Sequence, residues 1–215
     1  QYEMCYTNIL QILDLAQIPL WQKDRSDQDP IILCGGPCTY NPEPIADFCD
    51  LCYIGEGEIS YDALLNLYKD MKHAGNYTRA EFLRKAAQIP GIYVPSLYEV
   101  TYQEDGTIAA MTPRFADVPE KVKRQVLVNM DEGAYPTKPL VPFVRATQDR
   151  VVLEIQRGCI RGCRFCQAGM VYRPNREKSL DLLKTYAKEM LDSTGHEEIS
   201  LSSLSSSDYT QLPEL

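Results

Sequence analysis

The sequence has no run of apolar residues that approaches the ~20 that a membrane-crossing helix requires. It also lacks a basic segment followed by a short apolar one, which is the pattern of a secretory signal peptide. No internal repeat and no extended low-complexity region is found along the chain. We therefore expect a cytoplasmic protein without a membrane partner.

Basic residues are few relative to acidic ones. The 215 residues include 22 Lys and Arg against 30 Asp and Glu, which gives a formal net charge of −8. An acidic surface repels phosphate backbones, so the composition argues against general nucleic-acid binding. The hydrophobic fraction of 44% and the length are ordinary for a globular chain of one large domain or two unequal ones.

The sign of the charge changes locally between residues 157 and 178. This basic island contains Arg157, Arg161, Arg164, Arg173, Arg176 and Lys178, against Glu177 alone. Such a run is usually a solvated face. Because it coincides with three cysteines, we interpret it as functional. Its arginines would hold a substrate-side carboxylate, dock an acidic electron donor, or meet an anionic substrate, and the sequence does not choose among these.

Histidine is scarce and cysteine is plentiful. There are two histidines and eight cysteines. Without a secretion signal, cysteines are better read as thiols or metal ligands than as a disulfide framework. They fall into groups: Cys5 alone, Cys34 with Cys38, Cys49 with Cys52, and Cys159, Cys163 and Cys166 together.

Hydrophobic periodicity predicts alternating helices and short strands in the first half of the chain. Thr78 and Glu81 form a capping-box pattern ahead of one helix. Asp105-Gly106 predicts the turn of a β-hairpin. The expected elements are a helix over 7–18, strands over 31–34 and 51–54, a helix beginning near 61, the capped helix ending near 90, and the hairpin after 98.

The second half predicts an α/β domain after an extended connector. Residues 113–149 are rich in proline and have little periodicity. A strand over 151–155, a cysteine loop, a helix from Ser179 to about 192 and a strand over 198–201 follow. This order is the opening βαβ unit of a parallel structure. The predicted domains are therefore 1–112 and 150–215, with 113–149 as the connector.

The cysteine loop places Cys159, Cys163 and Cys166 within eight residues. Gly158 and Gly162 are expected to let the backbone fold so that the three thiolates converge. Electron-transfer iron–sulfur clusters normally use four thiolates. Three leave one iron open, and a vacant coordination position is typical of a catalytic site.

The Cys-x3-Cys-x2-Cys spacing, with Phe165 before the third cysteine and a strand before the loop, resembles the radical SAM signature. The resemblance implies that Cys159, Cys163 and Cys166 hold a [4Fe–4S] cluster whose open iron binds S-adenosylmethionine. One electron from the cluster then cleaves it to methionine and a 5′-deoxyadenosyl radical. The electron donor would be a flavodoxin or ferredoxin, and the fold a partial TIM barrel of about six βα units.

The same resemblance suggests which residues contact S-adenosylmethionine. The backbone beside Phe165 would lie near the adenine. Ser202, Ser203 or Ser205 would approach the methionine amino group at the end of the second strand. Many members of the family carry a glycine-rich motif at that strand end, and this chain has serines there instead.

The N-terminal part resembles the second half of a cobalamin-binding-type Rossmann domain. Gly35, Gly36, Gly55 and Gly57 match the glycines that allow close approach to cobalamin in such domains, although simple turn-making also accounts for them. The whole chain resembles an uncharacterised family of B12-binding-like radical SAM proteins, particularly over Asn41–Pro44 and Gln167–Met170. The Asp-x-His-x-x-Gly motif of base-off cobalamin proteins is absent, and its usual place would precede residue 1.

The resemblance also implies a chain truncated at both ends, since only the first βα unit and the next strand of the barrel occur. We expect this piece alone to bind a cluster poorly and to be inactive. Methyl transfer is the attractive reaction class if cobalamin is a second cofactor, while the substrate cannot be read from the sequence.

Two alternatives use the same cysteine loop. A non-catalytic zinc-binding interaction module would need a fourth ligand, for which His73 and His196 are the two histidines. A ferredoxin-like electron carrier lacks a nearby fourth cysteine. Cys34, Cys38, Cys49 and Cys52 allow a second metal site, but we favour the interpretation that Cys34 and Cys52 are small buried strand residues.

Overall fold

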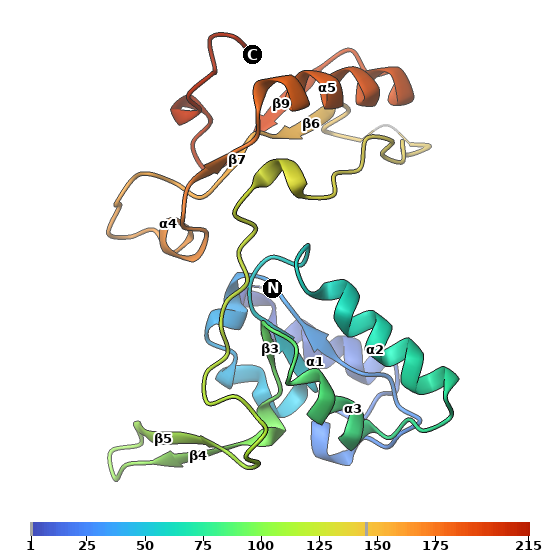
Figure 1. The fold of residues 1–215 in the computed structure, drawn as a ribbon, viewed down its shortest axis with the longest axis vertical. Coiled ribbons are helices and arrows are strands. Elements are labelled where there is room, and N and C mark those ends of the chain that lie inside the picture. Colours follow the sequence, from blue (N-terminus) through green and yellow to red (C-terminus); the bar gives the residue numbers. More distant parts are fainter. Residues whose placement is uncertain (1, 145) are drawn as a thin grey trace. The chain divides into compact units, whose positions relative to one another are not determined.

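The computed structural model describes residues 2–144 and 146–215 and divides into two compact units, Gln1–Val126 and Leu127–Leu215 (Figure 1). Both units combine helices with small sheets, which is consistent with the predicted α/β class. Residues of the predicted connector contribute to both units. The domain boundaries drawn from the sequence stay predictions, as do the Rossmann and TIM-barrel assignments.

The described residues of the first unit form three α-helices and five strands. Its helices are α1 (Tyr6–Leu15), α2 (Tyr61–His73) and α3 (Arg79–Ala86). Its strands are β1 (Leu33–Cys34), β2 (Leu51–Tyr53), β3 (Ile92–Tyr93), β4 (Tyr98–Tyr102) and β5 (Ile108–Pro113). All elements predicted from the sequence in this part are present, and short 3-10 turns connect several of them.

The main sheet of the first unit has the order β1-β2-β3. β1 and β2 are parallel, with Leu33 opposite Leu51, whereas β3 is antiparallel to β2. We did not predict β3 from the sequence, because this strand has only two residues after Pro90-Gly91 and is too short to show a periodic pattern. Gly91 has φ of 87°, which favours glycine, and its carbonyl accepts a 2.7 Å hydrogen bond from Ile54 N.

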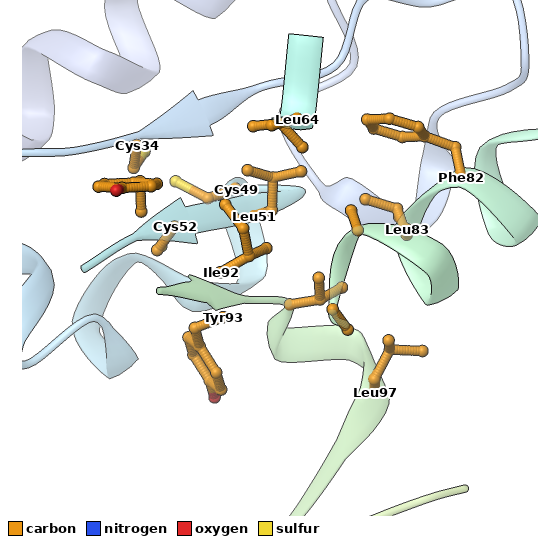
Figure 2. Close-up of a cluster of buried hydrophobic side chains, with 14 of the residues drawn as sticks. Cys34, Cys49, Leu51, Cys52, Leu64, Phe82, Leu83, Ile92, Tyr93 and Leu97 are labelled. Carbon is orange, nitrogen blue, oxygen red and sulfur yellow. The ribbon is translucent and has the colours of Figure 1, made fainter. Parts of the chain in front are cut away.

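The core of the first unit lies between this sheet and its helices. Figure 2 shows side chains of β1, β2 and β3 together with Leu64 of α2 and with Phe82 and Leu83 of α3. Ile9 and Leu13 of α1 are also buried in this core. Ile12, which lies on the same apolar stripe at helical spacing from Ile9, is 61% exposed, so the buried face of α1 is narrower than the periodicity indicates.

Two local predictions about the first unit are confirmed. Thr78 is the N-cap of α3, where its hydroxyl accepts a 3.3 Å hydrogen bond from Glu81 N. β4 and β5 form the predicted hairpin, with Val100 opposite Met111. At its turn, Asp105 accepts hydrogen bonds from the backbone N and the hydroxyl of Thr107.

The second unit is built on a βαβ arrangement, as predicted. β6 (Val151–Glu154) and β9 (Ile199–Ser202) are parallel neighbours, and α5 (Leu180–Thr194) lies between them in the chain. The buried side chains of β6 pack with those of Leu183, Met190 and Tyr209. The remaining elements are β7 (Gln156–Arg157), β8 (Arg176–Glu177) and the four-residue α4 (Ala168–Val171).

The backbone groups at the two ends of α5 find their hydrogen-bond partners in different ways. Ser179 is the N-cap, but its side chain forms no capping bond, and its backbone N donates to Asp131 Oδ1 at 2.9 Å instead. At the C-terminal end, Gly195 adopts φ of 74°, the left-handed conformation common after helices. The helix thus extends slightly beyond the predicted end near residue 192.

The edge of β6 that faces away from β9 is closed by a side chain. The hydroxyl of Tyr135 donates to Val152 O at 2.7 Å and accepts from Glu154 N at 3.1 Å, so it takes the place of a neighbouring strand. Tyr135 is itself stacked on Tyr186, with ring centroids 5.1 Å apart. None of the helices among the described residues combines the length and apolar character that a bilayer crossing requires.

Candidate metal centre

The three predicted cluster ligands lie in one loop whose two ends are paired. β7 precedes the loop and β8 follows it, and the two strands are antiparallel, with Gln156 opposite Glu177 and Arg157 opposite Arg176. Residues 158–175 therefore form a closed loop at the end of the β6 strand. The sequence did not reveal this pairing, because each strand contains only two residues.

Gly158 is required at the base of this loop. Its φ is 88°, and a Cβ at this position would lie 2.5 Å from Pro174 O and 2.8 Å from Tyr172 O. A side chain would thus push the two ends of the loop apart. Gly162, which we expected to play the same part, has no atom within 4 Å of such a Cβ and no positive φ. The expectation for Gly162 is therefore wrong.

The sulfur atoms of the loop are accessible to different degrees. Cys163 is exposed, while Cys159 and Cys166 are half-buried, and all three are free thiols. The backbone N of Arg161 donates to Cys159 Sγ at 3.4 Å. Among the residues that the structure describes, no group of three or more His, Cys, Asp or Glu side chains is arranged to hold a metal. The assignment of the three ligands stays a prediction.

Most of the basic island supports the loop itself. Arg157 forms a bidentate ion pair with Glu154, at 2.7 and 3.0 Å. Arg173 donates to the carbonyl oxygens of Gly169 and Arg161. Arg176 is buried and donates to Pro174 O and to other carbonyl oxygens. These guanidinium groups are committed to the protein, whereas we had interpreted the island as a surface for ligands or partners.

Two arginines of the island differ from these. Arg161 forms a bidentate ion pair with Asp208, with Nε 3.0 Å from Oδ2. Its guanidinium, together with a hydrogen bond from Ser205, holds the pKa of Asp208 below its usual value. Arg164 forms no hydrogen bond or ion pair with any residue that the structure describes, and its side chain is exposed.

The predicted contacts to S-adenosylmethionine lie on two neighbouring segments of this unit. Ser202 ends β9, and Ser203 and Ser205 are in the loop that follows it, here called the serine loop (residues 203–208). Ser205 O accepts a 2.6 Å hydrogen bond from Gln156 Nε2, directly before the cysteine loop. Phe165 is 91% exposed. The structure thus brings Ser205 beside the start of the cysteine loop, which spacing in the sequence did not show.

The glycines matched to cobalamin proteins lie at the carboxyl ends of β1 and β2. Gly55 has φ of 122°, and a Cβ there would lie 2.2 Å from Gln125 O, so packing of the chain explains this glycine. Gly36 has φ of 96° and begins a 3-10 turn. A Cβ on Gly35 would meet nothing within 4 Å, and one on Gly57 would meet only Tyr61 at 3.9 Å. Open space therefore lies beside Gly35, whereas Gly57 is within contact distance of Tyr61 and Gln125 fills the space at Gly55.

Three of the remaining cysteines, Cys34, Cys49 and Cys52, lie in the core of the first unit. Cys34 and Cys52 are buried strand residues opposite each other in register, as we favoured from the sequence, and Cys49 is buried beside them (Figure 2). Hydrogen bonds among the three thiols lower the pKa of Cys34 and raise the pKa of Cys49 and of Cys52. Cys38 is also buried, and burial raises its pKa.

Sequence reasoning missed three residues of the site. Gln156, Asp208 and Tyr135 connect the cysteine loop, the serine loop and the edge of β6 through the contacts described above. Tyr135 is in the connector, where no periodic pattern marks it. Asp208 could have been found from the sequence. It is an acidic residue at the end of the serine run that directly follows the strand predicted over 198–201.

A comparison with a known protein family concerns the N-terminal part of the chain. Residues 1–95 match a family described as the N-terminal region of radical SAM proteins. The match ends before the cysteine loop, so the two indications come from different parts of the chain.

The chain is also similar to an uncharacterized protein of Methanocaldococcus jannaschii, with 29% identity over 218 residues. The alignment covers 100% of this chain but 39% of that protein, so the chain spans about two fifths of the relative's length. Residues 1–95 are thus similar to the N-terminal region of radical SAM proteins, and this match supports the radical SAM superfamily for the chain.

Proposed function

We propose that the chain is the part of a radical SAM enzyme that carries the cluster loop. The observation that supports this proposal most strongly is the loop that carries Cys159, Cys163 and Cys166, closed by β7 and β8 beside a parallel βαβ unit. The match of residues 1–95 to the N-terminal region of radical SAM proteins supports it independently.

The donor set suits an iron–sulfur cluster with one open iron. Three thiols within eight residues are the whole set, and neither histidine lies within the loop. Cys163 is exposed and the other two are half-buried, so none of the three thiols that would hold the cluster belongs to the core. When bound, the cluster supplies the electron that cleaves S-adenosylmethionine to methionine and a 5′-deoxyadenosyl radical.

The chain's own residues would bind and orient S-adenosylmethionine. Ser202, Ser203 and Ser205 present hydroxyl groups at the carboxyl end of β9, the end of a parallel strand where ligands of α/β proteins bind. The backbone beside Phe165, a residue that is 91% exposed, would lie near the adenine. Exposed Arg164 provides a cation for an acidic electron donor such as a flavodoxin or ferredoxin.

The proposal includes cobalamin as a second cofactor, at the edge of the sheet that carries Gly35, Gly36 and Gly57. The open space beside Gly35 is the observation that supports this part, and Gly55 is left out because Gln125 fills its space. Titration of the full-length protein with hydroxocobalamin, followed by its visible absorption, tests it. An unchanged cobalamin spectrum and free cobalamin after gel filtration would remove cobalamin from the proposal.

The central experiment is electron paramagnetic resonance of the full-length protein after anaerobic reconstitution and reduction. We expect a [4Fe–4S]⁺ signal that shifts when S-adenosylmethionine is added. Variants C159A, C163A and C166A lose the signal, while C5A, a cysteine outside every group described above, retains it. Stoichiometric zinc with no iron, bound irrespective of S-adenosylmethionine, would instead identify a metal-stabilised interaction module.

A further inference from the structure

One ion pair joins the cysteine loop to the serine loop. Arg161 lies midway between Cys159 and Cys163, and Asp208 lies 47 residues further along the chain. Arg161 Nε and Nη2 contact the two carboxylate oxygens of Asp208, a bidentate geometry that fixes orientation as well as distance. The Arg161 side chain is 61% exposed and that of Asp208 is 10% exposed.

Asp208 is held in place from within the serine loop. Its Oδ2 accepts a 2.8 Å hydrogen bond from the Ser205 hydroxyl, and its backbone N donates to Ser205 O at 3.0 Å. The next residue, Tyr209, is buried and donates its hydroxyl to Lys178 O at 2.9 Å. Asp208 is therefore a fixed acceptor rather than a mobile surface carboxylate.

Arg161 is held through its backbone as well as its side chain. Its N donates to Cys159 Sγ at 3.4 Å, and its O accepts from Arg173 Nη2 at 2.7 Å. A chain of contacts thus leads from Cys159 through Arg161 and Asp208 to Ser205. Cys159, at one end of this chain of contacts, is a predicted cluster ligand. Ser205, at the other end, is a predicted contact of S-adenosylmethionine.

An ion pair of this exposure contributes little to the net stability of a protein. The bidentate geometry nevertheless determines where the cysteine loop lies. Its two hydrogen bonds fix both the distance between Arg161 and Asp208 and the orientation of the two side chains. A role in positioning is therefore expected to be separable from a role in folding, and the two roles give different experimental results.

We propose that Arg161 is a positioning residue that holds the cysteine loop against the serine loop by its ion pair with Asp208. The pair keeps Cys159 and Ser205 on one edge of the unit, so that the cluster and the amino-acid end of S-adenosylmethionine meet there. This inference rests on the proposed function for its ligand. The contact between the two loops itself belongs to the protein without cofactors.

The first test uses full-length protein without a cluster, so it does not depend on the proposed chemistry. The rate of alkylation of Cys159 by iodoacetamide, measured by mass spectrometry, reports how freely the loop moves. We expect R161Q and D208N to raise this rate several-fold. The exchanged pair R161D/D208R restores a slow rate, because it recreates the attraction between the two loops.

Two controls separate positioning from loss of charge and from loss of an ion pair in general. R164Q removes a positive charge from the same loop without removing a contact. R84Q removes the bidentate pair of Arg84 with Asp117, an exposed pair of the first unit with Nε 2.9 Å from Oδ2. Both controls leave the alkylation rate of Cys159 unchanged. Equal rates for R161Q and R164Q would overturn the proposal.

The second test uses reconstituted protein. We expect R161Q to retain its iron but to bind S-adenosylmethionine roughly 10-fold more weakly, because residues that orient a metal ligand have effects of this size. The affinity is measured as the concentration of S-adenosylmethionine that shifts the paramagnetic signal. Unchanged affinity in R161Q would overturn the link to S-adenosylmethionine. Wild-type protein that binds no iron would overturn the proposed function instead, while the alkylation result still stands.

Discussion

The side-chain amide of Gln156 donates a 2.6 Å hydrogen bond to the backbone oxygen of Ser205. Gln156 is buried in β7, one residue before Arg157 and the turn into the cysteine loop, whereas Ser205 belongs to the serine loop. Together with the Arg161–Asp208 pair, this bond ties the two segments together at two places. Its buried end also carries an oxygen, Oε1, that has no hydrogen-bond partner in the described part of the chain.

Replacement of Gln156 by leucine is expected to destabilise the second unit. The variant Q156L leaves Ser205 O without its donor inside the protein, which costs about 1–3 kcal/mol. Hydrogen exchange of residues 199–209 in the full-length protein measures this loss as faster exchange. Q148L, at an exposed glutamine of the same unit, serves as the control. Equal exchange in both variants would show that the Gln156 bond is unimportant.

Gly158 and Gly162 are expected to respond differently to alanine. G158A places a methyl group 2.5 Å from Pro174 O at a φ of 88°, so the base of the loop is strained by more than about 1 kcal/mol. G162A meets no atom within 4 Å. Iron content after reconstitution, with hydrogen exchange of residues 156–177, is expected to fall in G158A alone. A normal iron content in G158A would contradict the role given to this glycine.

Asp50 is expected to be essential for the stability of the first unit. Its carboxylate is fully buried and accepts from Arg25 at 3.1 Å and from Arg79 at 2.7 Å. D50A leaves both guanidinium groups without their carboxylate, which costs about 3–5 kcal/mol. Urea unfolding measures the effect. D117N, which breaks an exposed ion pair of the same unit, leaves the midpoint nearly unchanged, and a similar midpoint for D50A would refute the prediction.

The first unit is expected to lose stability at alkaline pH. Burial, followed by the hydrogen bond to Glu43, raises the pKa of Tyr93. An unfolded tyrosine loses its proton near pH 10, whereas folded Tyr93 retains it. The stability that Tyr93 contributes is therefore complete below about pH 10 and declines as the pH rises further.

Urea midpoints across pH 8–11, a range of roughly one to two units around the usual tyrosine value, test this prediction. Y93F loses the 2.6 Å bond to Glu43 and is about 1 kcal/mol less stable at neutral pH, but its stability depends less on pH. Y102F, at an exposed tyrosine, keeps the wild-type slope. A wild-type slope in Y93F would mean that other groups cause the alkaline transition.

Elements that depend on neighbouring residues were predictable from the sequence. Thr78 with Glu81 predicts a helix start and Asp105-Gly106 predicts a hairpin turn, each from residues within a few positions, and the structure has both. The strand, helix and strand of the second unit were predictable for the same reason, since their apolar periods are local. The three-cysteine spacing likewise predicted a single loop.

Which face of an element is buried was only partly predictable. Ile12 shares the apolar stripe of α1 with Ile9 and Leu13, yet it is exposed. Periodicity gives the width of a stripe, but the packing partner decides how much of it is covered. The antiparallel direction of β3 was equally hidden, because a two-residue strand has no period.

By itself, the sequence determined the local elements, the loop of three thiols and the resemblance that points to their chemistry. Only the tertiary structure decided that most arginines of the basic island bind the protein's own carboxylates and carbonyl oxygens, that Cys49 joins Cys34 and Cys52, and that Arg161 meets Asp208. These contacts join residues that are distant along the chain or depend on how loops close. Their formation depends on the path of the whole backbone, which no local pattern of residues encodes.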